Sequence, residues 1–373
     1  MRQYKGLRHI ASALIIAAIT IALCETVAFF VLKTIQPPSS LAIFEDNLVS
    51  GGRVTAVRAN LDQRWRTAEF DVAMRTNSNG YREDFDFKLA DVEFAFMGDS
   101  FTFGHGVEVR ERYTDLFAGQ LTDKTDPSHV ASLAGSNGFQ PEHYEYFLKT
   151  HPDLRPKYIV VGLYLGNDLE PDVRETRFDR HSLTLDLPYR AVDSGVIVNA
   201  APYRVPFSRT LIRISKTARL TAILLNRSIY RSYLFEENAA IPSGYNSDSL
   251  EFGEFNEFSN RAFESLLNIR DLARQRGGRL VVFLIPQNFY AGPVTRPHLA
   301  PGLWPRIPEI LAKGGLRAAV VNRCKEMQLD CIDAGSVMTT EDFFPADAHW
   351  NRRGHHKAAD LLYRYFSANE GMR

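Results

Sequence analysis

The sequence carries no excess of charge of either sign, because 44 Lys and Arg residues balance 44 Asp and Glu residues. A protein that binds nucleic acid usually shows a basic surplus or a basic stripe. Cysteine is also scarce, and the three cysteines do not form the clusters that hold zinc. The composition therefore predicts neither a nucleic-acid partner nor a zinc site.

A phosphate-binding loop is missing too. Gly104-His105-Gly106 is a short glycine-rich stretch, but it lacks the Lys-Ser/Thr ending of such loops. We expect no cofactor and no metal ion. With 373 residues, of which 45% are hydrophobic, the chain has room for one large domain, or one domain plus an insertion, around a well-buried core.

One long hydrophobic run dominates the N-terminal region. Residues 10–32 are almost entirely apolar, and a membrane helix needs about 20 such residues. Arg2, Lys5 and Arg8 precede the run, so the positive-inside rule places the short N-terminus in the cytoplasm. The prediction is a single-pass protein of the cytoplasmic (inner) membrane, whose remaining residues lie in the periplasm or another extracytoplasmic space.

A cleaved signal peptide is the alternative. Its apolar region would span about 7–15 residues and would end in small residues at a cleavage site. The run at 10–32 is longer and ends in large residues (FFVLK), which favours an uncleaved anchor.

Cys324 and Cys331 lie seven positions apart, one in an expected helix and the other at the next strand. In an oxidising compartment the two thiols could pair. Two separate buried thiols are an equal alternative, because spacing alone does not show whether the Cα atoms come within bridging distance.

Short apolar runs alternate with helical patterns over most of the chain. Strands are expected at 92–97, 129–134, 158–164, 279–285 and 330–332, and helices at 113–121, 142–149, 255–276, 310–328 and 353–368. Elements that alternate in this way imply a parallel sheet with helices on both faces. The predicted fold class is α/β: a three-layer α/β/α sandwich with a central parallel sheet of about five strands.

The same pattern divides the chain into parts. Residues 1–33 hold the cytoplasmic tip and the anchor, and residues 34–90 hold a linker and an N-terminal β extension. Within this extension, residues 70–75 alternate between apolar and polar side chains, as a strand does. Residues 91–373 form the main domain, which an insertion interrupts at about 170–260. A helix rich in Arg, Leu and Ile is expected within this insertion, at 210–233.

Polar or glycine-rich clusters follow three of the expected strands. Ser100, Gly135 and Asn167 each come directly after a strand. In parallel sheets, ligands bind outside the carboxyl ends of the strands. We therefore expect the three clusters to share one site.

Several stretches resemble the motif blocks of the SGNH (GDSL) hydrolase superfamily, in the order that the family has them. They are residues 96–107 (FMGDSFTFGHGV), 131–136 (ASLAGS), 166–168 (GND) and 347–355 (DAHWNRRGH). Residues 76–82 (TNSNGYR) resemble a segment that often precedes these blocks in membrane-linked members. The resemblance covers roughly residues 70–170 and 278–370. It implies the flavodoxin-like sandwich of SGNH hydrolases.

The resemblance also implies roles for single residues. Ser100 would be the nucleophile, His349 the general base, and Asp347 the carboxylate that orients His349. The N–H groups of Ser100 and Gly135 and the side-chain amide of Asn167 would form the oxyanion hole.

Some assignments have alternatives. Gly138 competes with Gly135, and Asn167 taken alone could merely cap a turn. Asp347 could be a loop carboxylate, and His349 a surface histidine before a helix that Asn351 caps.

Other polar residues are weaker candidates. His105 belongs to the loop after Ser100 or contacts the substrate. Arg209 and Arg213, with Lys216, could place positive charge on one face of a helix that binds an anionic polysaccharide or lipid head groups. A solvated helix face is the simpler reading of these basic residues. A metal site from Asp347, His349 and His355 is disfavoured.

The leading hypothesis is an extracytoplasmic serine esterase that hydrolyses carboxylic esters, such as O-acetyl groups on a carbohydrate or cell-envelope polymer. An O-acyltransferase would use the same residues and would move the acyl group onto a polysaccharide hydroxyl. A non-catalytic, membrane-tethered glycan-binding or scaffold protein is a third possibility, which predicts decay of the motifs. The sequence shows no such decay at Ser100, Asn167, Asp347 or His349.

Overall fold

The computed structural model describes residues 2–35, 44–49, 52–66, 69–121, 129–133, 139–169, 177–179, 184–186, 215–217, 247–294, 297–299, 301–345 and 347–370. The chain splits into two compact units. The first comprises Met1–Leu41 and Ala191–Ala240, and the second comprises Ala42–Arg190 and Ile241–Arg373.

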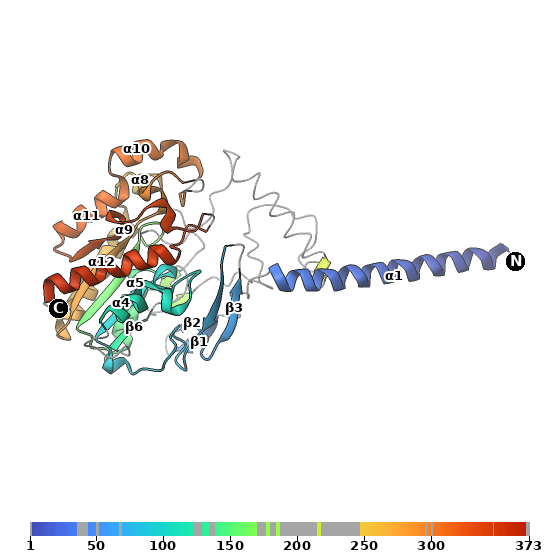
Figure 1. Ribbon diagram of the computed structural model, residues 1–373, viewed down its shortest axis with the longest axis horizontal. Helices are drawn as coiled ribbons and strands as arrows, with labels where there is room; N and C mark the ends of the chain where they lie inside the picture. Colours follow the sequence, from blue (N-terminus) through green and yellow to red (C-terminus); the bar gives the residue numbers. More distant parts are fainter. Residues whose placement is uncertain are drawn as a thin grey trace. The chain divides into compact units, whose positions relative to one another are not determined.

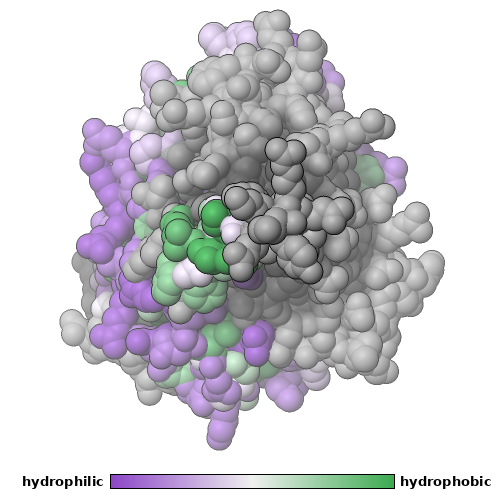
Figure 2. Space-filling model, turned by 90° about the vertical axis from the view of Figure 1, so that its right-hand side faces the viewer, coloured by the Kyte–Doolittle hydropathy of each residue, from purple (hydrophilic) through white to green (hydrophobic). Residues whose placement is uncertain are grey.

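The described part of the first unit is one long helix, α1 (Arg2–Ile35), and the short segment 215–217. Its segment Ser12–Val31 is long and apolar enough to cross a membrane, as a signal sequence near an N-terminus also is. Most of the large hydrophobic side chains that are exposed in the described parts of the chain lie on α1, and Phe258 and Leu311 are the exceptions. Hydrophilic residues, by contrast, cover most of the described surface that faces the viewer in Figure 2. Burying the apolar surface of α1 would require a bilayer or another apolar partner.

One ionisable side chain lies within this apolar helix. The carboxylate of Glu25 accepts hydrogen bonds from the hydroxyl of Ser215 and from the backbone N–H groups of Lys216 and Thr217. Charged groups at membrane depth are costly unless they are paired. The contact thus supplies Glu25 with three donors from a segment that is distant in sequence.

The second unit contains a parallel sheet of five strands. In spatial order these are β11 (Cys331–Asp333), β10 (Arg279–Ile285), β7 (Tyr158–Tyr164), β5 (Phe94–Gly98) and β6 (Val130–Ser132). All neighbouring pairs in the sheet are parallel. The predicted sheet is confirmed, and its strand order is the flavodoxin-like one.

The strand order reverses direction between β5 and β7. The chain runs from β5 to the edge strand β6 and then returns to β7 on the other side of β5. Such a reversal opens a crevice at the carboxyl ends of the two strands, where ligands bind in open α/β sheets. Ser100 and Asn167 follow these two strands, so the topology places both at the crevice.

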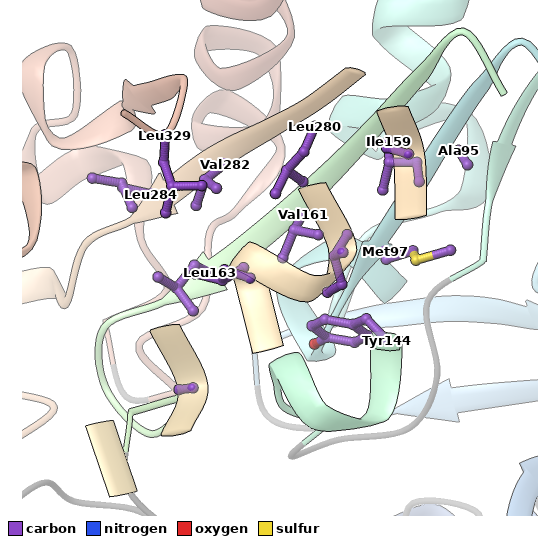
Figure 3. Close-up of a cluster of buried hydrophobic side chains, with 14 of the residues drawn as sticks. Ala95, Met97, Tyr144, Ile159, Val161, Leu163, Leu280, Val282, Leu284 and Leu329 are labelled. Carbon is purple, nitrogen blue, oxygen red and sulfur yellow. The ribbon is translucent and has the colours of Figure 1, made fainter. Parts of the chain in front are cut away.

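Helices cover both faces of the sheet, because strand residues point to alternate sides. One face packs against α5 (Pro141–Thr150), α9 (Glu257–Gln275) and α11 (Gly315–Glu326). Figure 3 shows part of this core, in which Met97, Val161 and Val282 lie on one side of the sheet with Tyr144 of α5. The other face packs against α4 (Tyr113–Leu121) and α12 (Arg352–Glu370), which lie side by side in Figure 1. The predicted three-layer sandwich is confirmed.

The N-terminal β extension consists of two antiparallel hairpins. The first joins β1 (Phe44–Val49) to β2 (Gly52–Val57), and the second joins β3 (Asp62–Arg66) to β4 (Asp71–Arg75). A third small hairpin, β8 (Arg177–Asp179) with β9 (Thr184–Asp186), falls in the region that the sequence marks as an insertion. Of these strands, the alternation of the sequence predicts only β4.

The remaining helices and turns are short. They are η1 (Leu89–Asp91), α3 (Ser100–Phe103), η2 (Val109–Glu111), α8 (Asp248–Glu251), η5 (Asn288–Ala291), η6 (Pro301–Arg306), α10 (Ile307–Ala312), η7 (Ala334–Ser336) and η8 (Thr340–Asp342).

The single helix predicted at 310–328 is two helices, α10 and α11, because Gly314 and Gly315 adopt φ angles of 79° and 54°. Left-handed residues end a helix.

Cys324 and Cys331 form a disulfide, with Cα atoms 6.2 Å apart, so the pairing that spacing left open is made.

Candidate active site

Ser100 stands at the first position of α3, directly beyond the end of β5. Asp99 caps this helix, since its Oδ1 accepts a hydrogen bond of 3.0 Å from the backbone N–H of Phe101. The joint between strand and helix is tight: a Cβ on Gly98 would lie 1.9 Å from Oγ1 of Thr102. Glycine at position 98 is therefore what allows α3 to turn back so sharply and to present Ser100 at the edge of the sheet.

The structure brings Ser100, His349 and Asp347 together. The hydroxyl of Ser100 lies 2.7 Å from Nε2 of His349. Nδ1 of the same ring is hydrogen-bonded to Oδ1 of Asp347. The three side chains form the chain of contacts that a serine hydrolase triad requires.

The loop that carries Asp347 and His349 is a tight turn. The residue between them, Ala348, has a φ of 69°, which is uncommon for any residue with a Cβ. Backbone hydrogen bonds hold the turn in place: Phe344 N–H donates to the His349 carbonyl at 2.8 Å, and Ala348 N–H donates to the Phe344 carbonyl at 3.2 Å. The left-handed residue allows two side chains of one loop to meet.

Asn351 follows this loop and caps the last helix, α12. Its Oδ1 accepts a hydrogen bond of 2.9 Å from the backbone N–H of Arg353. The sequence suggests this cap, and the structure shows it together with the triad contacts of His349. The cap at Asn351 is therefore present, but it does not account for the contacts that His349 makes with Ser100 and Asp347.

The pKa values of the pair fit a general base. Burial by itself would lower the pKa of His349, but the Asp347 carboxylate outweighs it and raises the pKa. Burial would raise the pKa of Asp347, but His349 and then His105 hold it well below its usual range. Asp347 is therefore ionised wherever His349 titrates, and His349 is available to accept a proton.

The expected oxyanion hole is described in part. Gly135 and its competitor Gly138 lie outside the described residues. Asn167 lies half-buried just past β7, and its backbone carbonyl accepts a 3.0 Å hydrogen bond from Nε2 of Gln140. Its side-chain Oδ1 is buried and has no hydrogen-bond partner among the described residues, so this oxygen does not cap the turn.

Two buried carboxyl groups lie under the site. Asp168 closes the turn after β7, because its Oδ2 accepts a 2.8 Å hydrogen bond from the N–H of Tyr164. Burial raises its pKa well above the usual value, and Asp99 raises it further. Burial also raises the pKa of Asp99 to about 6. Both carboxyl groups accept hydrogen bonds from backbone N–H groups and so stabilise the turns that follow β5 and β7.

His105 lies against the triad. Its Nε2 is 3.1 Å from Oδ2 of Asp347, and its ring stacks on that of His349 with centroids 4.1 Å apart. The side chain is buried, and only 8% of the residue is exposed. The expected contact with substrate stays a prediction, and what the structure adds is the contact with Asp347.

Arg82 is a further residue of the site whose role the sequence does not reveal. It belongs to the TNSNGYR segment, and its guanidinium donates to the backbone carbonyls of Phe103, Gly104, Val107 and Ala73 at 2.6–3.1 Å. Three of these carbonyls belong to the loop that follows Ser100. The TNSNGYR segment thus fixes the loop that holds His105.

The neighbouring residue, Glu83, reaches a different strand. Its Oε1 accepts a 2.9 Å hydrogen bond from the N–H of Ser132 on β6, and its Oε2 pairs with buried Arg112 at 2.9 Å. Arg112 also pairs with Asp115 at 2.7 Å. Residues placed in the N-terminal extension by the sequence therefore pack inside the sandwich.

His298 is another residue near the triad that motif reasoning misses. Its Nδ1 contacts the hydroxyl of Tyr164, and the two rings stack. Burial lowers the pKa of His298 to about 4, with a smaller effect from His349. Tyr164 also contacts the ring of Phe101, so it links His298 to α3.

Other expected residues fall elsewhere. His355 is buried on α12, where its Nδ1 accepts a 3.2 Å hydrogen bond from the N–H of Tyr113. Arg209 and Arg213 lie outside the described residues. His105, Asp347 and His349 each offer one ligand atom within 4.8 Å of the others, so this trio, rather than one with His355, has the geometry to hold a metal ion.

No protein-family model and no curated protein sequence matches the chain. Similar solved structures include a GDSL-like lipase from Bacteroides thetaiotaomicron, at 10% identity and a TM-score of 0.37, which covers 74% of this chain and 89% of that one. A carbohydrate acetylesterase family member from Sinorhizobium meliloti matches at 14% identity and a TM-score of 0.34, covering 75% and 100%. An aryl esterase from M. smegmatis matches at 14% and 0.34, covering 74% and 99%.

Proposed function

We propose that this chain is a membrane-anchored serine esterase that acts outside the cytoplasm on O-acyl groups, such as acetyl, of a carbohydrate or cell-envelope polymer. The observation that carries the proposal is the continuous contact from the Ser100 hydroxyl through His349 to Asp347. This arrangement activates a serine toward an ester carbonyl.

The chemistry proceeds in two halves. Oγ of Ser100 attacks the ester carbonyl while Nε2 of His349 takes the hydroxyl proton. The ester C–O bond then breaks, the leaving alcohol receives that proton, and the acyl group stays on Ser100. In the second half, His349 takes a proton from water while the water oxygen attacks the acyl carbonyl. The bond between Ser100 Oγ and the acyl carbon then breaks, the carboxylic acid leaves, and Ser100 recovers its proton from His349.

The oxyanion that forms in each half needs hydrogen-bond donors. We assign this role to the N–H of Ser100 at the start of α3, to the N–H of Gly135 and to the side-chain amide of Asn167. A single donor of this kind is typically worth about 10²–10³ in turnover. Asp347 keeps His349 in the tautomer that can accept a proton at Nε2.

Two features support an extracytoplasmic location. The Cys324–Cys331 disulfide suits an oxidising compartment, since disulfides are rare in the reducing cytosol. The apolar segment Ser12–Val31 could hold the protein at the membrane. An envelope polymer is the ester-bearing substrate that such a site would meet.

The test is the turnover of p-nitrophenyl acetate and of an acetylated oligosaccharide by the purified full chain in detergent. Ser100→Ala should abolish turnover, with a loss of roughly 10⁴-fold or more, and should leave the melting temperature unchanged. Ser336→Ala, at an exposed serine remote from Ser100 in sequence, is the matched control and should keep full activity. Unchanged turnover in Ser100→Ala would refute the proposal.

Two further measurements separate the alternatives. A fluorophosphonate should label the wild-type protein at Ser100, and a protein that is not labelled would be a binding or scaffold protein. Product analysis with an added acceptor glycan should show free acetate. Acetylated acceptor as the main product would assign acyl transfer instead of hydrolysis.

A further inference from the structure

His105 is held in place from several sides. Its backbone N–H donates to the carbonyl of Ser100 at 3.0 Å, and Gly104 and Gly106 on either side have φ angles of 81° and 82°. Such angles favour glycine, so the loop around His105 is built to a specific shape. The guanidinium of Arg82 donates hydrogen bonds to three backbone carbonyls of this loop. The backbone position of His105 is therefore fixed.

The imidazole also sits in an aromatic environment. Trp65 and Phe70, from the β3–β4 hairpin, meet its ring edge to face, with centroids 4.4 Å and 5.3 Å away. The ring of His349 lies nearly parallel to it, at an angle of 17°. The polar partner that the structure gives to the ring is Oδ2 of Asp347, at 3.1 Å.

The environment decides which nitrogen of His105 carries hydrogen. Burial lowers the pKa of His105, and the neighbouring His349 lowers it further, against the opposite effect of Asp347, which favours the neutral ring. Nδ1 is buried and has no hydrogen-bond partner among the described residues. A neutral imidazole has one N–H group. That hydrogen lies on Nε2, because only there does it meet an acceptor, the Asp347 carboxylate.

Both oxygens of Asp347 are consequently engaged by imidazoles. Oδ1 accepts from Nδ1 of His349, and Oδ2 accepts from Nε2 of His105. A carboxylate held at one oxygen can rotate about its Cβ–Cγ bond, whereas one held at both oxygens cannot do so without losing a hydrogen bond. Partners of this kind, which act on a functional group through its neighbour, are worth about 10–100-fold where they have been removed from metal sites.

We infer that His105 is a positioning residue, which holds the Asp347 carboxylate through a second imidazole–carboxylate hydrogen bond and so orients His349 toward Ser100. The inference rests on the proposed esterase function. The hydrogen bond of the His105 ring goes to Asp347, so the residue acts on His349 through that carboxylate. Its stacked, neutral ring also lets His349 become charged without a second positive charge beside it.

Removing the His105 donor should change the pKa of His349 in a known direction. A hydrogen bond to Oδ2 offsets part of the negative charge that Asp347 presents to His349. Without that bond the carboxylate presents more negative charge to His349, so the pKa of His349 should rise. The other titratable groups that act on or near His349 stay in place, namely Asp99, His298 and His355.

The test compares two variants of the full chain. His105→Phe keeps an aromatic ring against Trp65 and Phe70 but removes the donor. His105→Gln keeps a donor at about the reach of Nε2 but removes the ring. His105→Phe should lower kcat by about 10–100-fold at unchanged KM, and should move the acidic limb of the kcat/KM profile to higher pH. His105→Gln should recover most of the kcat and should return the acidic limb close to its wild-type pH. His356→Phe, at an exposed histidine of α12, should match the wild type.

Other results would overturn the inference. Equal losses of kcat in both variants with an unmoved limb would assign His105 a packing role, and a change in KM alone would make it a substrate contact. Loss of wild-type activity on chelation would point to a metal ion held by the same trio. If His105→Phe does not fold, His105→Asn, whose amide is too short to reach Asp347, takes its place. Activity retained in Ser100→Ala would instead refute the proposed function itself, so the two failures are distinguishable.

Discussion

The hydroxyl of Ser100 lies 2.7 Å from Nε2 of His349, although the two residues are 249 positions apart in the chain. Ser100 is placed by the end of β5, and His349 by the turn that precedes α12. α12 packs against the same face of the sheet as α3 and α4, so the last turn before it reaches the carboxyl end of β5. The contact thus forms because α12 packs on the same face of the sheet as α3.

Asp347→Asn should lower kcat by about 10⁴-fold, because an amide can donate to His349 and stabilise the wrong tautomer. The protein should still fold, since asparagine has nearly the same shape. Kinetics on p-nitrophenyl acetate, together with a thermal melt, would measure both. A loss of less than tenfold would mean that Asp347 does not orient His349.

The pH dependence of kcat/KM should show an acidic limb at a higher pH than an ordinary histidine gives. His349 must be neutral to accept a proton, so activity rises as pH increases through its pKa. Asp347 raises that pKa above the usual value of about 6.5. A pH series from about 5 to 9 would locate the limb, and a limb below pH 6 would contradict the assignment.

Arg82→Met should destabilise the protein by about 3–5 kcal/mol, because it leaves several buried backbone carbonyls without a donor. Arg75→Met on β4 is the matched control. Arg75 is exposed, and its ion pair with Asp62 is worth at most about 1 kcal/mol. Thermal unfolding of both variants tests the difference, and equal melting temperatures would show that Arg82 does not hold the loop.

Reduction of the Cys324–Cys331 disulfide should lower the free energy of unfolding by about 2–3 kcal/mol, which is the entropy expected for closing so short a loop. A double variant with serine at both positions should melt at the temperature of the reduced wild type and should not respond to reductant. Cys24→Ser is the control, because Cys24 is free. A wild-type melting temperature that does not change with reductant would count against a structural disulfide.

Much of the sandwich is predictable from sequence alone. The apolar runs at 158–164 and 279–285 coincide with β7 and β10, because strands buried on both faces need continuous apolar residues. Ser100 is also picked out by the motif block at residues 96–107, which places it just after an expected strand. Helix 310–328 fails as a single element, because a pattern of apolar positions does not register the left-handed angles of Gly314 and Gly315.

The contacts that hold the triad are decided by the tertiary structure. His105 and Asp347 are 242 positions apart, and the sequence leaves His105 as a loop residue or a substrate contact. Its burial depends on Trp65 and Phe70, which come from a hairpin whose first strand the pattern does not predict. The disulfide likewise depends on a Cα distance of 6.2 Å that spacing cannot supply.

The motifs of the sequence therefore indicate which residues would carry the proposed chemistry, because the candidate nucleophile, base and carboxylate are recognised by residue type and local sequence. The packing of the layers determines how they are held. Arg82, Glu83 and His105 act through hydrogen bonds to distant backbone or side-chain atoms. Such partners leave no periodic signal in the chain, since a hydrogen bond depends on distance in space rather than on separation in sequence.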